Sequence, residues 1–158
     1  MAIQVGDRLP DVELQVMGEN GPEKVSTGQL CAGQKVVIFA VPGAFTPTCS
    51  AAHLPGFVVD ADKIKAKGVD RIICTSVNDT FVMDAWGKAH NAEELVMLAD
   101  GMGDFAKALG LTQDRTANQM GIRSQRYAMI VDDGVVKLLN IDEKGLESTS
   151  SEAILAAL

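Results

Sequence analysis

Three short apolar runs constrain the fold of this chain more than any other feature. They cover residues 35–41 (KVVIFAV), 71–77 (RIICTSV) and 95–100 (LVMLAD). A continuous apolar run of this length, without regular alternation of polar residues, is typical of a strand that is buried on both faces. Strands of that kind occur in sheets that helices cover on both sides. The sequence therefore predicts a central sheet that is at least partly parallel.

The segments between these runs have the pattern of helices. Residues 48–67 predict a helix that ends at Gly68, which is suited to a C-terminal cap. Pro55 lies inside this segment and is expected to kink or split the helix, because proline has no backbone N–H. Two further helices are expected, one capped by Asn78 or Asp79 and continuing to His90, and one over residues 104–109.

A hairpin and a closing helix complete the pattern. Residues 126–142 predict two apolar strands around Asp133-Gly134, a dipeptide that suits a tight turn with positive φ. Residues 149–152 (TSSE) have the spacing of a capping box before the apolar tail AILAAL. Parallel strand–helix–strand units followed by an antiparallel hairpin predict an α/β mixed sheet flanked by helices, with a thioredoxin-like outline. No repeat or linker divides the chain, so we expect a single domain over residues 1–158.

The composition narrows the class of protein and its environment. The 14 basic and 21 acidic residues give a formal net charge of −7 without a basic stripe, which argues against a nucleic-acid binder. No charged-then-apolar signal region opens the chain, and no apolar run approaches membrane-spanning length, so we expect no membrane partner. Three cysteines without a signal region fit a reducing compartment, and we expect the cytoplasm.

One cysteine lies where reactive groups usually collect in open α/β sheets, beyond the end of a buried strand. Cys49 closes the stretch VPGAFTPTCS, in the first turn of the next predicted helix. The unpaired N–H groups and the partial positive charge of a helix start favour a thiolate over a thiol. Thr46 can hydrogen-bond to the sulfur or to whatever the sulfur attacks, and Pro42 and Pro47 stiffen the loop. The stretch therefore predicts a reactive thiol.

The same stretch resembles the signature of a known family. Pro42-x-x-x-Thr46-x-x-Cys49 matches the peroxiredoxin motif, and the wider PGAFTPTCSAAHLPGF is similar to the type II, or peroxiredoxin-five, branch. Further matching stretches are SVNDTFVMDAWGKAH (76–90), MLADG (97–101) and SQRYAMIVDDG (124–134). The resemblance covers nearly the whole chain. It implies a thioredoxin fold, a homodimer, and thiol-dependent reduction of hydrogen peroxide and alkyl hydroperoxides.

The resemblance also implies a role for each residue of the motif. Cys49 would be the peroxidatic cysteine, whose thiolate becomes a sulfenic acid, and Thr46 would hold the sulfur and the incoming peroxide. Pro42 would shield the sulfur from water, and Arg126 matches the family's active-site arginine. The backbone N–H groups of Thr48 and Cys49 would point at the peroxide oxygens.

Simple acid–base arithmetic indicates what the arginine is needed for. An ordinary thiol is about 3% ionised at neutral pH, and nearly complete ionisation gains about 30-fold in thiolate. The accompanying loss of nucleophilicity removes about tenfold, so the net gain is only about threefold. The larger effect must act on the negative charge that grows on the departing oxygen. We therefore expect Arg126 to stabilise the leaving oxygen in a preorganised pocket.

The sulfenic acid must be reduced, and two sources of the reducing thiol are open. Ser148 stands where animal-like members of this branch carry a C-terminal resolving cysteine, so that route is absent. Cys74 matches the second cysteine of plant-like members, but it lies in an apolar strand, and a bond to Cys49 would need local unfolding. The other source is external, glutathione with a glutaredoxin, which we favour, or thioredoxin. No role is assigned to Cys31.

No metal or other cofactor is expected. His53 follows Cys49 by four residues and can share its helix face. A structural zinc site needs about four ligands, however, and the only other histidine is His90. We expect His53 to form local hydrogen bonds that steady the loop at the mouth of the site. Phe45 lies in that loop and is expected to contact the substrate or a partner chain.

Two other functions compete with a peroxidase. A thioredoxin-type disulfide oxidoreductase needs C-x-x-C, because its second thiol releases the mixed disulfide. Here Thr46 occupies the first position of that pair, which argues against this class. No residue argues against a redox relay or a chaperone without peroxide turnover. A relay would reveal itself by oxidising a partner protein in catalytic amounts without consuming reductant.

Overall fold

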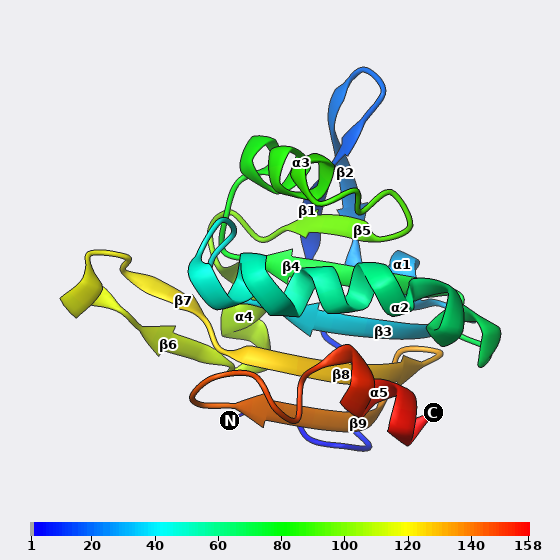
Figure 1. Ribbon diagram of the computed structural model, residues 1–158. Coiled ribbons are helices and arrows are strands. Elements are labelled where there is room, and N and C mark those ends of the chain that lie inside the picture. The colour runs from blue at the N-terminus through cyan, green and yellow to red at the C-terminus, as the bar shows by residue number, and fades with distance from the viewer. Residues whose placement is uncertain (1) are drawn as a thin grey trace.

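The computed structural model describes residues 2–158 and is built around one seven-stranded mixed sheet. The strands are β1 (Glu13–Gly18), β2 (Gly21–Ser26), β3 (Lys35–Ala40), β4 (Arg71–Ser76), β5 (Val96–Ala99), β8 (Arg126–Asp132) and β9 (Val135–Asp142). Their order across the sheet is β2-β1-β5-β4-β3-β8-β9 (Figure 1). The three apolar runs are the parallel strands β3, β4 and β5, and the remaining pairings are antiparallel. This confirms the predicted mixed sheet.

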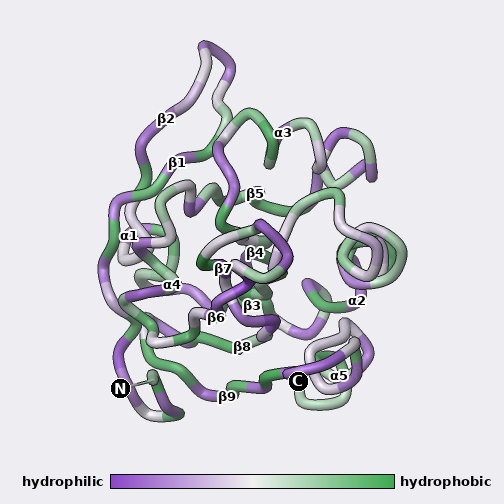
Figure 2. Tube along the Cα trace, turned by 90° about the vertical axis from the view of Figure 1, so that its left-hand side faces the viewer, coloured by the Kyte–Doolittle hydropathy of each residue, from purple (hydrophilic) through white to green (hydrophobic). Residues whose placement is uncertain are grey.

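Helices cover both faces of the sheet, as the buried strands require. They are α1 (Thr27–Cys31), α2 (Leu54–Ala66), α3 (Thr80–Ala89), α4 (Asp104–Leu109) and α5 (Ser151–Ala157). Figure 2 shows α1 and α4 on one side of the strands and α2 and α5 on the other. The core on the side of α2, α3 and α5 contains Phe39, Phe57 and Trp86, and the core on the other side contains Leu98 and Phe105. The sheet is therefore the middle layer of three.

The helix expected over residues 48–67 is not interrupted at Pro55, because His53 and Leu54 at the junction both keep right-handed helical dihedrals, but its hydrogen-bond pattern changes there. Its first turn is a π-helix, η1 (Cys49–His53), in which the Leu54 N–H donates to the Cys49 carbonyl five residues back. Pro55 follows in the first turn of α2, where its missing N–H costs least. Gly68 adopts a positive φ of 96° just beyond α2, as expected of the residue that ends the helix.

The helix caps show which residue caps α3, which the sequence left open, and correct the predicted cap of α5. Asp79, rather than Asn78, caps α3 by accepting the Val82 N–H at 2.8 Å. At the start of α5 the cap is Ser150, which accepts the Ala153 N–H, so the capping box predicted from Thr149 is wrong by one residue. Thr149 is not free to cap the helix, because its hydroxyl donates to Asp142 at 2.7 Å.

Several elements were not expected from the sequence. The β1–β2 hairpin and α1 precede the first apolar run, and a small separate sheet pairs β6 (Thr112–Asp114) with β7 (Ile122–Ser124) around the 3-10 turn η2 (Thr116–Asn118). The β8–β9 hairpin, in contrast, turns at Asp133 and Gly134 with positive φ at both, as predicted. No helix within residues 2–158 combines the length and the apolar character needed to cross a membrane.

Candidate active site

The reactive-thiol candidate lies just beyond the end of β3, on the first residue of the π-helical turn. Cys49 is only 1% exposed, and its turn is tied to the neighbouring helix because Trp86 Nε1 donates to Ser50 Oγ at 3.0 Å. The loop before it is fixed by a hydrogen bond of 3.0 Å from the Ala44 N–H to Asn78 Oδ1. No side chain caps the start of this turn. The Ser50 N–H donates to the Thr46 carbonyl at 2.9 Å, so the N–H groups before it, those of Thr48 and Cys49, are the ones left for the site.

The guanidinium of Arg126 lies directly against the sulfur. Arg126 Nη2 donates to Cys49 Sγ at 3.0 Å, and the arginine is itself buried. The sheet explains this proximity, because β8 runs antiparallel to β3 and pairs Tyr127 with Ala40. The first residue of β8 therefore lies beside the end of β3, where the chain turns toward Cys49. The structure thus brings together the two residues that the resemblance had paired.

His53 holds the other side of the same guanidinium. Its Nδ1 accepts from Arg126 Nη1 at 2.6 Å, and its Nε2 donates to the Thr149 carbonyl at 2.9 Å. A guanidinium only donates and a carbonyl only accepts, so the ring carries its proton on Nε2. Burial, and then the charge of Arg126, lower the pKa of His53 to about 3, so the ring is neutral at physiological pH. The expected local hydrogen-bonding residue is therefore a bridge between Arg126 and the segment before α5.

Thr46 does not bond to the sulfur in this structure. Its hydroxyl donates to the Gly43 carbonyl at 2.7 Å, and a hydroxyl has only one proton to give. The lone pairs of the oxygen are still able to accept a hydrogen bond. The part of the expectation that had Thr46 hold the sulfur is therefore not realised here, whereas an acceptor role toward a ligand is compatible with the geometry.

A polar cavity of about 310 Å³ lies against Arg126 and is not lined by Cys49 itself. Pro42, Thr48 and Arg126 form part of its wall, together with charged side chains of the segments at residues 113–115 and 142–145. Pro42 is buried, whereas Thr48 is exposed at the start of the helical turn. Phe45 is 55% exposed, has a φ of 62°, and does not line this cavity. The structure thus brings Pro42 and Thr48 to the site and leaves the Phe45 ring free at its edge.

The other two thiols, Cys31 and Cys74, are buried at positions that disfavour the thiolate. Cys74 lies in β4 with Phe39 and Met97 as its neighbours across the sheet, and burial raises its pKa well above the usual value. Cys31 lies in the core on the opposite face, and burial raises its pKa to about 11. All three cysteines are free. Cys49 differs from both in one respect, which is the guanidinium of Arg126 that donates to its sulfur.

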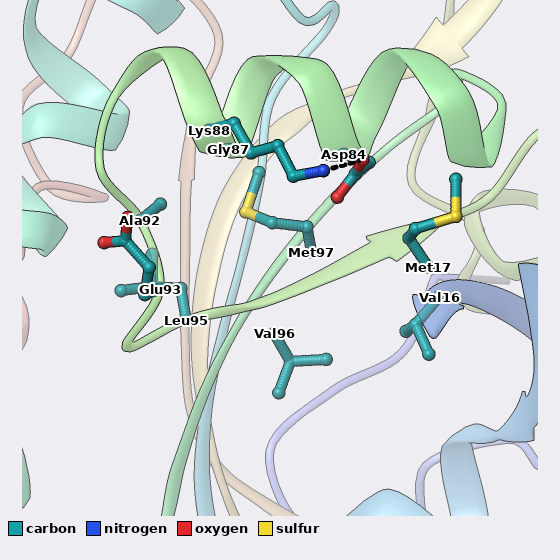
Figure 3. A pocket seen from close by; sticks show the side chains of 10 residues that line it. All are labelled: Val16, Met17, Asp84, Gly87, Lys88, Ala92, Glu93, Leu95, Val96 and Met97. Atoms are coloured by element: carbon teal, nitrogen blue, oxygen red, sulfur yellow. Dashed lines mark ion pairs between the residues drawn. The ribbon is translucent and has the colours of Figure 1, made fainter. Parts of the chain in front are cut away.

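A second cavity, of about 320 Å³, is unrelated to this site. It lies between α3 and the strands β1 and β5, with Met17 and Met97 pointing into it and an ion pair of 2.9 Å between Lys88 and Asp84 at its rim (Figure 3). No cysteine or histidine lines it. Among residues 2–158, no group of three or more His, Cys, Asp or Glu side chains is arranged to hold a metal ion.

Sequence reasoning missed two members of the site. Thr149 lies 96 positions after His53 and contacts it through its backbone carbonyl. Asp142 does not contact His53 and is linked to it only through Thr149, whose hydroxyl it accepts. Burial works to raise the pKa of Asp142, but hydrogen bonds from Glu147, Thr149 and Ser148 outweigh it and hold that pKa well below its usual range. The only sequence signal was the run of hydroxyl residues at 148–151 just after an acidic residue.

A helix-start thiol against a buried guanidinium, on a three-layer sheet of this topology, defines a thiol-based redox protein of the thioredoxin-like class. The Redoxin family profile matches residues 4–155. Peroxiredoxin-2C of Oryza sativa subsp. japonica is 50% identical over 159 residues, which cover 99% of this chain and 98% of that protein.

Solved structures agree with this assignment. Reduced Prx3 from Vibrio vulnificus, in complex with hydrogen peroxide, is 57% identical, with a TM-score of 0.95 and 98% of each chain covered. Peroxiredoxin 5 from Alvinella pompejana is 34% identical, with a TM-score of 0.86, covering 98% of this chain and 97% of that one. The chain belongs to the peroxiredoxin family, in its type II branch, and is a thiol-dependent peroxidase. The expected family and fold are confirmed.

Proposed function

We propose that this peroxiredoxin reduces hydrogen peroxide and alkyl hydroperoxides with Cys49 as the peroxidatic residue. The observation that carries the proposal is the 3.0 Å contact from Arg126 Nη2 to Cys49 Sγ at the start of a helix. The thiolate attacks one peroxide oxygen and the O–O bond breaks. The departing oxygen takes up a proton and leaves as water or as an alcohol. Cys49 is left as a sulfenic acid.

Arg126 acts in this step mainly on the leaving oxygen. Its guanidinium is already fixed by His53, so it can meet the developing negative charge without reorganising. The N–H groups of Thr48 and Cys49 at the helix start add further donors. Thr46, whose proton is directed to Gly43, accepts a hydrogen bond from the O–H of the peroxide. Together these groups fit the charge of the transition state better than that of the bound peroxide.

The substrate reaches the sulfur from the polar cavity that Pro42, Thr48 and Arg126 line. Cys49 is 1% exposed, so the approach is narrow, and Pro42 keeps bulk water from the sulfur. A peroxide O–O group is small enough to enter between Thr48 and Arg126. The bulk of an alkyl hydroperoxide would stay in the cavity.

The reductant in this proposal comes from outside the chain. Cys74 is fully buried in a central strand, and Cys31 lies on the far face of the sheet, so neither reaches Cys49 without local unfolding. A glutathione thiolate attacks the sulfenic sulfur and the S–O bond breaks, the departing hydroxide takes up a proton from solvent to leave as water, and a mixed disulfide forms. A glutaredoxin thiol then removes the glutathione and restores Cys49. We place this cycle in the cytoplasm, where the glutathione pool keeps thiols reduced.

The protein is proposed to act as a homodimer through an apolar face at the edge of the site. Its exposed apolar side chains are Phe45, Phe81, Met102 and Ile122. Contacts to the loop after β4 hold their segments together. Ala44 N–H donates to Asn78, Arg123 donates to the Val77 carbonyl, and Gly103 lies against the Val77 side chain. Four exposed apolar side chains from four segments that meet at one loop are typical of an interface.

The experiment that tests the function is peroxide consumption by Cys49→Ser, with Cys31→Ser as the matched control. In the presence of glutathione and a glutaredoxin, Cys49→Ser is expected to lose turnover and Cys31→Ser to keep it. The mass of the parent protein after one equivalent of hydrogen peroxide should rise by one oxygen, or by one glutathione when glutathione is present. A Cys49→Ser protein that consumes peroxide at the parent's rate would refute the proposal.

A further inference from the structure

We propose that Asp142 is a positioning residue for the peroxidase reaction: its carboxylate folds the segment before α5 so that Thr149 and His53 hold Arg126 against the sulfur of Cys49. The proposal rests on the proposed function for its kinetic consequence. The structural part, the link from Asp142 to the imidazole, stands by itself. Each link in the series is a hydrogen bond with a recorded length.

The carboxylate of Asp142 organises three consecutive residues. Its Oδ2 accepts the Glu147 N–H at 2.8 Å, the Thr149 N–H at 3.0 Å and the Thr149 hydroxyl at 2.7 Å. Its Oδ1 accepts the Ser148 N–H at 3.1 Å and the Ser148 hydroxyl at 2.8 Å. All five groups are donors, so only an ionised carboxylate, which is an acceptor at both oxygens, satisfies them all. An amide nitrogen in place of either oxygen would face at least one backbone N–H, which can only donate.

The segment that is held in this way delivers one carbonyl to the active site. Thr149 is fully buried, and its carbonyl accepts from His53 Nε2 at 2.9 Å. This bond selects the tautomer of the ring, because the nitrogen that donates must carry the proton. Nδ1 is then left as an acceptor that faces Arg126. The Thr149 carbonyl and the Arg126 guanidinium thus favour the same tautomer, and Asp142 folds the segment that supplies the carbonyl.

The imidazole in turn directs the guanidinium. Arg126 Nη1 donates to Nδ1 at 2.6 Å, and the same planar group places Nη2 at 3.0 Å from Cys49 Sγ. A proton on Nδ1 would face the N–H of Nη1 and push the guanidinium from this position. Because the guanidinium is rigid and planar, a shift at Nη1 also moves Nη2 away from the sulfur. Asp142 therefore acts on the reaction through the orientation of Arg126, without touching the sulfur.

The test compares Asp142→Asn with the parent and with Asp70→Asn. Asp70 is a suitable control because its carboxylate also accepts one backbone N–H, that of Lys35, at the opposite end of β3. The nitrogen shifts of the two histidines report the tautomer, and His90 serves as an internal reference. Stopped-flow oxidation of Cys49 by hydrogen peroxide reports the rate.

For the parent and for Asp70→Asn we expect a pure Nε2–H tautomer at His53 and equal rates. For Asp142→Asn we expect a mixed tautomer at His53, an unchanged His90, and oxidation slower by about tenfold. Should Asp142→Asn fail to fold, Thr149→Val removes only the 2.7 Å hydroxyl bond and should give a smaller change in the same direction, which Thr149→Ser should reverse.

Three results would overturn the inference. One is an unchanged tautomer in Asp142→Asn together with an unchanged rate, another is a changed tautomer with an unchanged rate, and the last is a slower rate with an unchanged tautomer. If the parent itself shows no oxidation of Cys49 by peroxide, the proposed function fails instead. The tautomer comparison still tests the structural link from Asp142 to His53 in that case.

Discussion

Arg126 Nη2 lies 3.0 Å from Cys49 Sγ, although the two residues are 77 positions apart in the chain. The antiparallel pairing of β8 with β3 creates this contact, and His53 fixes the guanidinium from its other side. The arrangement is preorganised, because the donor that meets the departing oxygen is in position before the peroxide arrives.

The three thiols should differ sharply in reactivity. At pH 8, iodoacetamide is expected to modify Cys49 first, since burial raises the pKa of Cys31 to about 11 and that of Cys74 well above its usual value. Peptide mass spectrometry after brief treatment measures the order. In denaturant all three should react at similar rates, which provides the control. Labelling of Cys31 or Cys74 in the native protein as fast as Cys49 would contradict the burial argument.

His53 should make the fold sensitive to mild acid. Its pKa is about 3 in the folded protein and about 6.5 in an unfolded chain, so between these values the unfolded state binds more protons. The free energy of unfolding therefore falls as the pH falls from 6.5 toward 3, by at most about 1.4 kcal/mol per pH unit. Urea unfolding of the parent and of His53→Gln at pH 6.5, 5.5 and 4.5 measures the effect. The variant should lose less stability across this range, and equal losses would show that His53 is not neutral in the fold.

Removing Cys74 should leave turnover intact. Cys74→Ser replaces a fully buried thiol in β4, so we expect some loss of stability but full peroxide turnover with glutathione and a glutaredoxin. Steady-state consumption of hydrogen peroxide with each reductant system measures this. A thioredoxin-driven activity that is present in the parent and absent in Cys74→Ser would instead identify Cys74 as a resolving cysteine.

The apolar face at the edge of the site should hold the dimer together. Phe81 is 65% exposed in the first turn of α3, where an aspartate is compatible with the helix dipole. Phe81→Asp is therefore expected to shift the protein from dimer to monomer in analytical ultracentrifugation without unfolding it. Val59→Asp, on the exposed side of α2, is the matched control and should stay dimeric. If both variants sediment like the parent, the dimer does not use this face.

The sequence predicted the sheet better than it predicted the site. The strands β3, β4 and β5 follow from a local pattern, because burial on both faces requires a continuous apolar run. The Asp133-Gly134 turn follows from another, because positive φ favours these residue types. The strand β2 (GPEKVS) is half-exposed and polar, so no apolar run in the sequence indicates its pairing with β1. The three-residue strands β6 and β7 are too short for a period to appear.

Within the site, the distance along the chain decided what was predictable. The thiol at the helix start follows from a local pattern around Cys49, and Arg126 was paired with it only through the family resemblance. The links from His53 to Thr149 and from Thr149 to Asp142 depend on how the segment after β9 folds back over α2. The capping-box pattern predicted Thr149 as the cap of the last helix, because no local pattern shows that the carboxylate of Asp142 accepts its hydroxyl instead.

The most direct test of the account is the single-turnover rate of Cys49 oxidation in Arg126→Lys and Arg126→Ala, measured at a pH where the thiol is fully ionised. Under that condition the arginine can no longer act by producing thiolate, so any remaining effect is on the departing oxygen. We expect a rate lower by about 100-fold in Arg126→Ala, as for the loss of one preorganised donor, and a partial recovery in Arg126→Lys. Rates equal to the parent's at full ionisation would contradict the account.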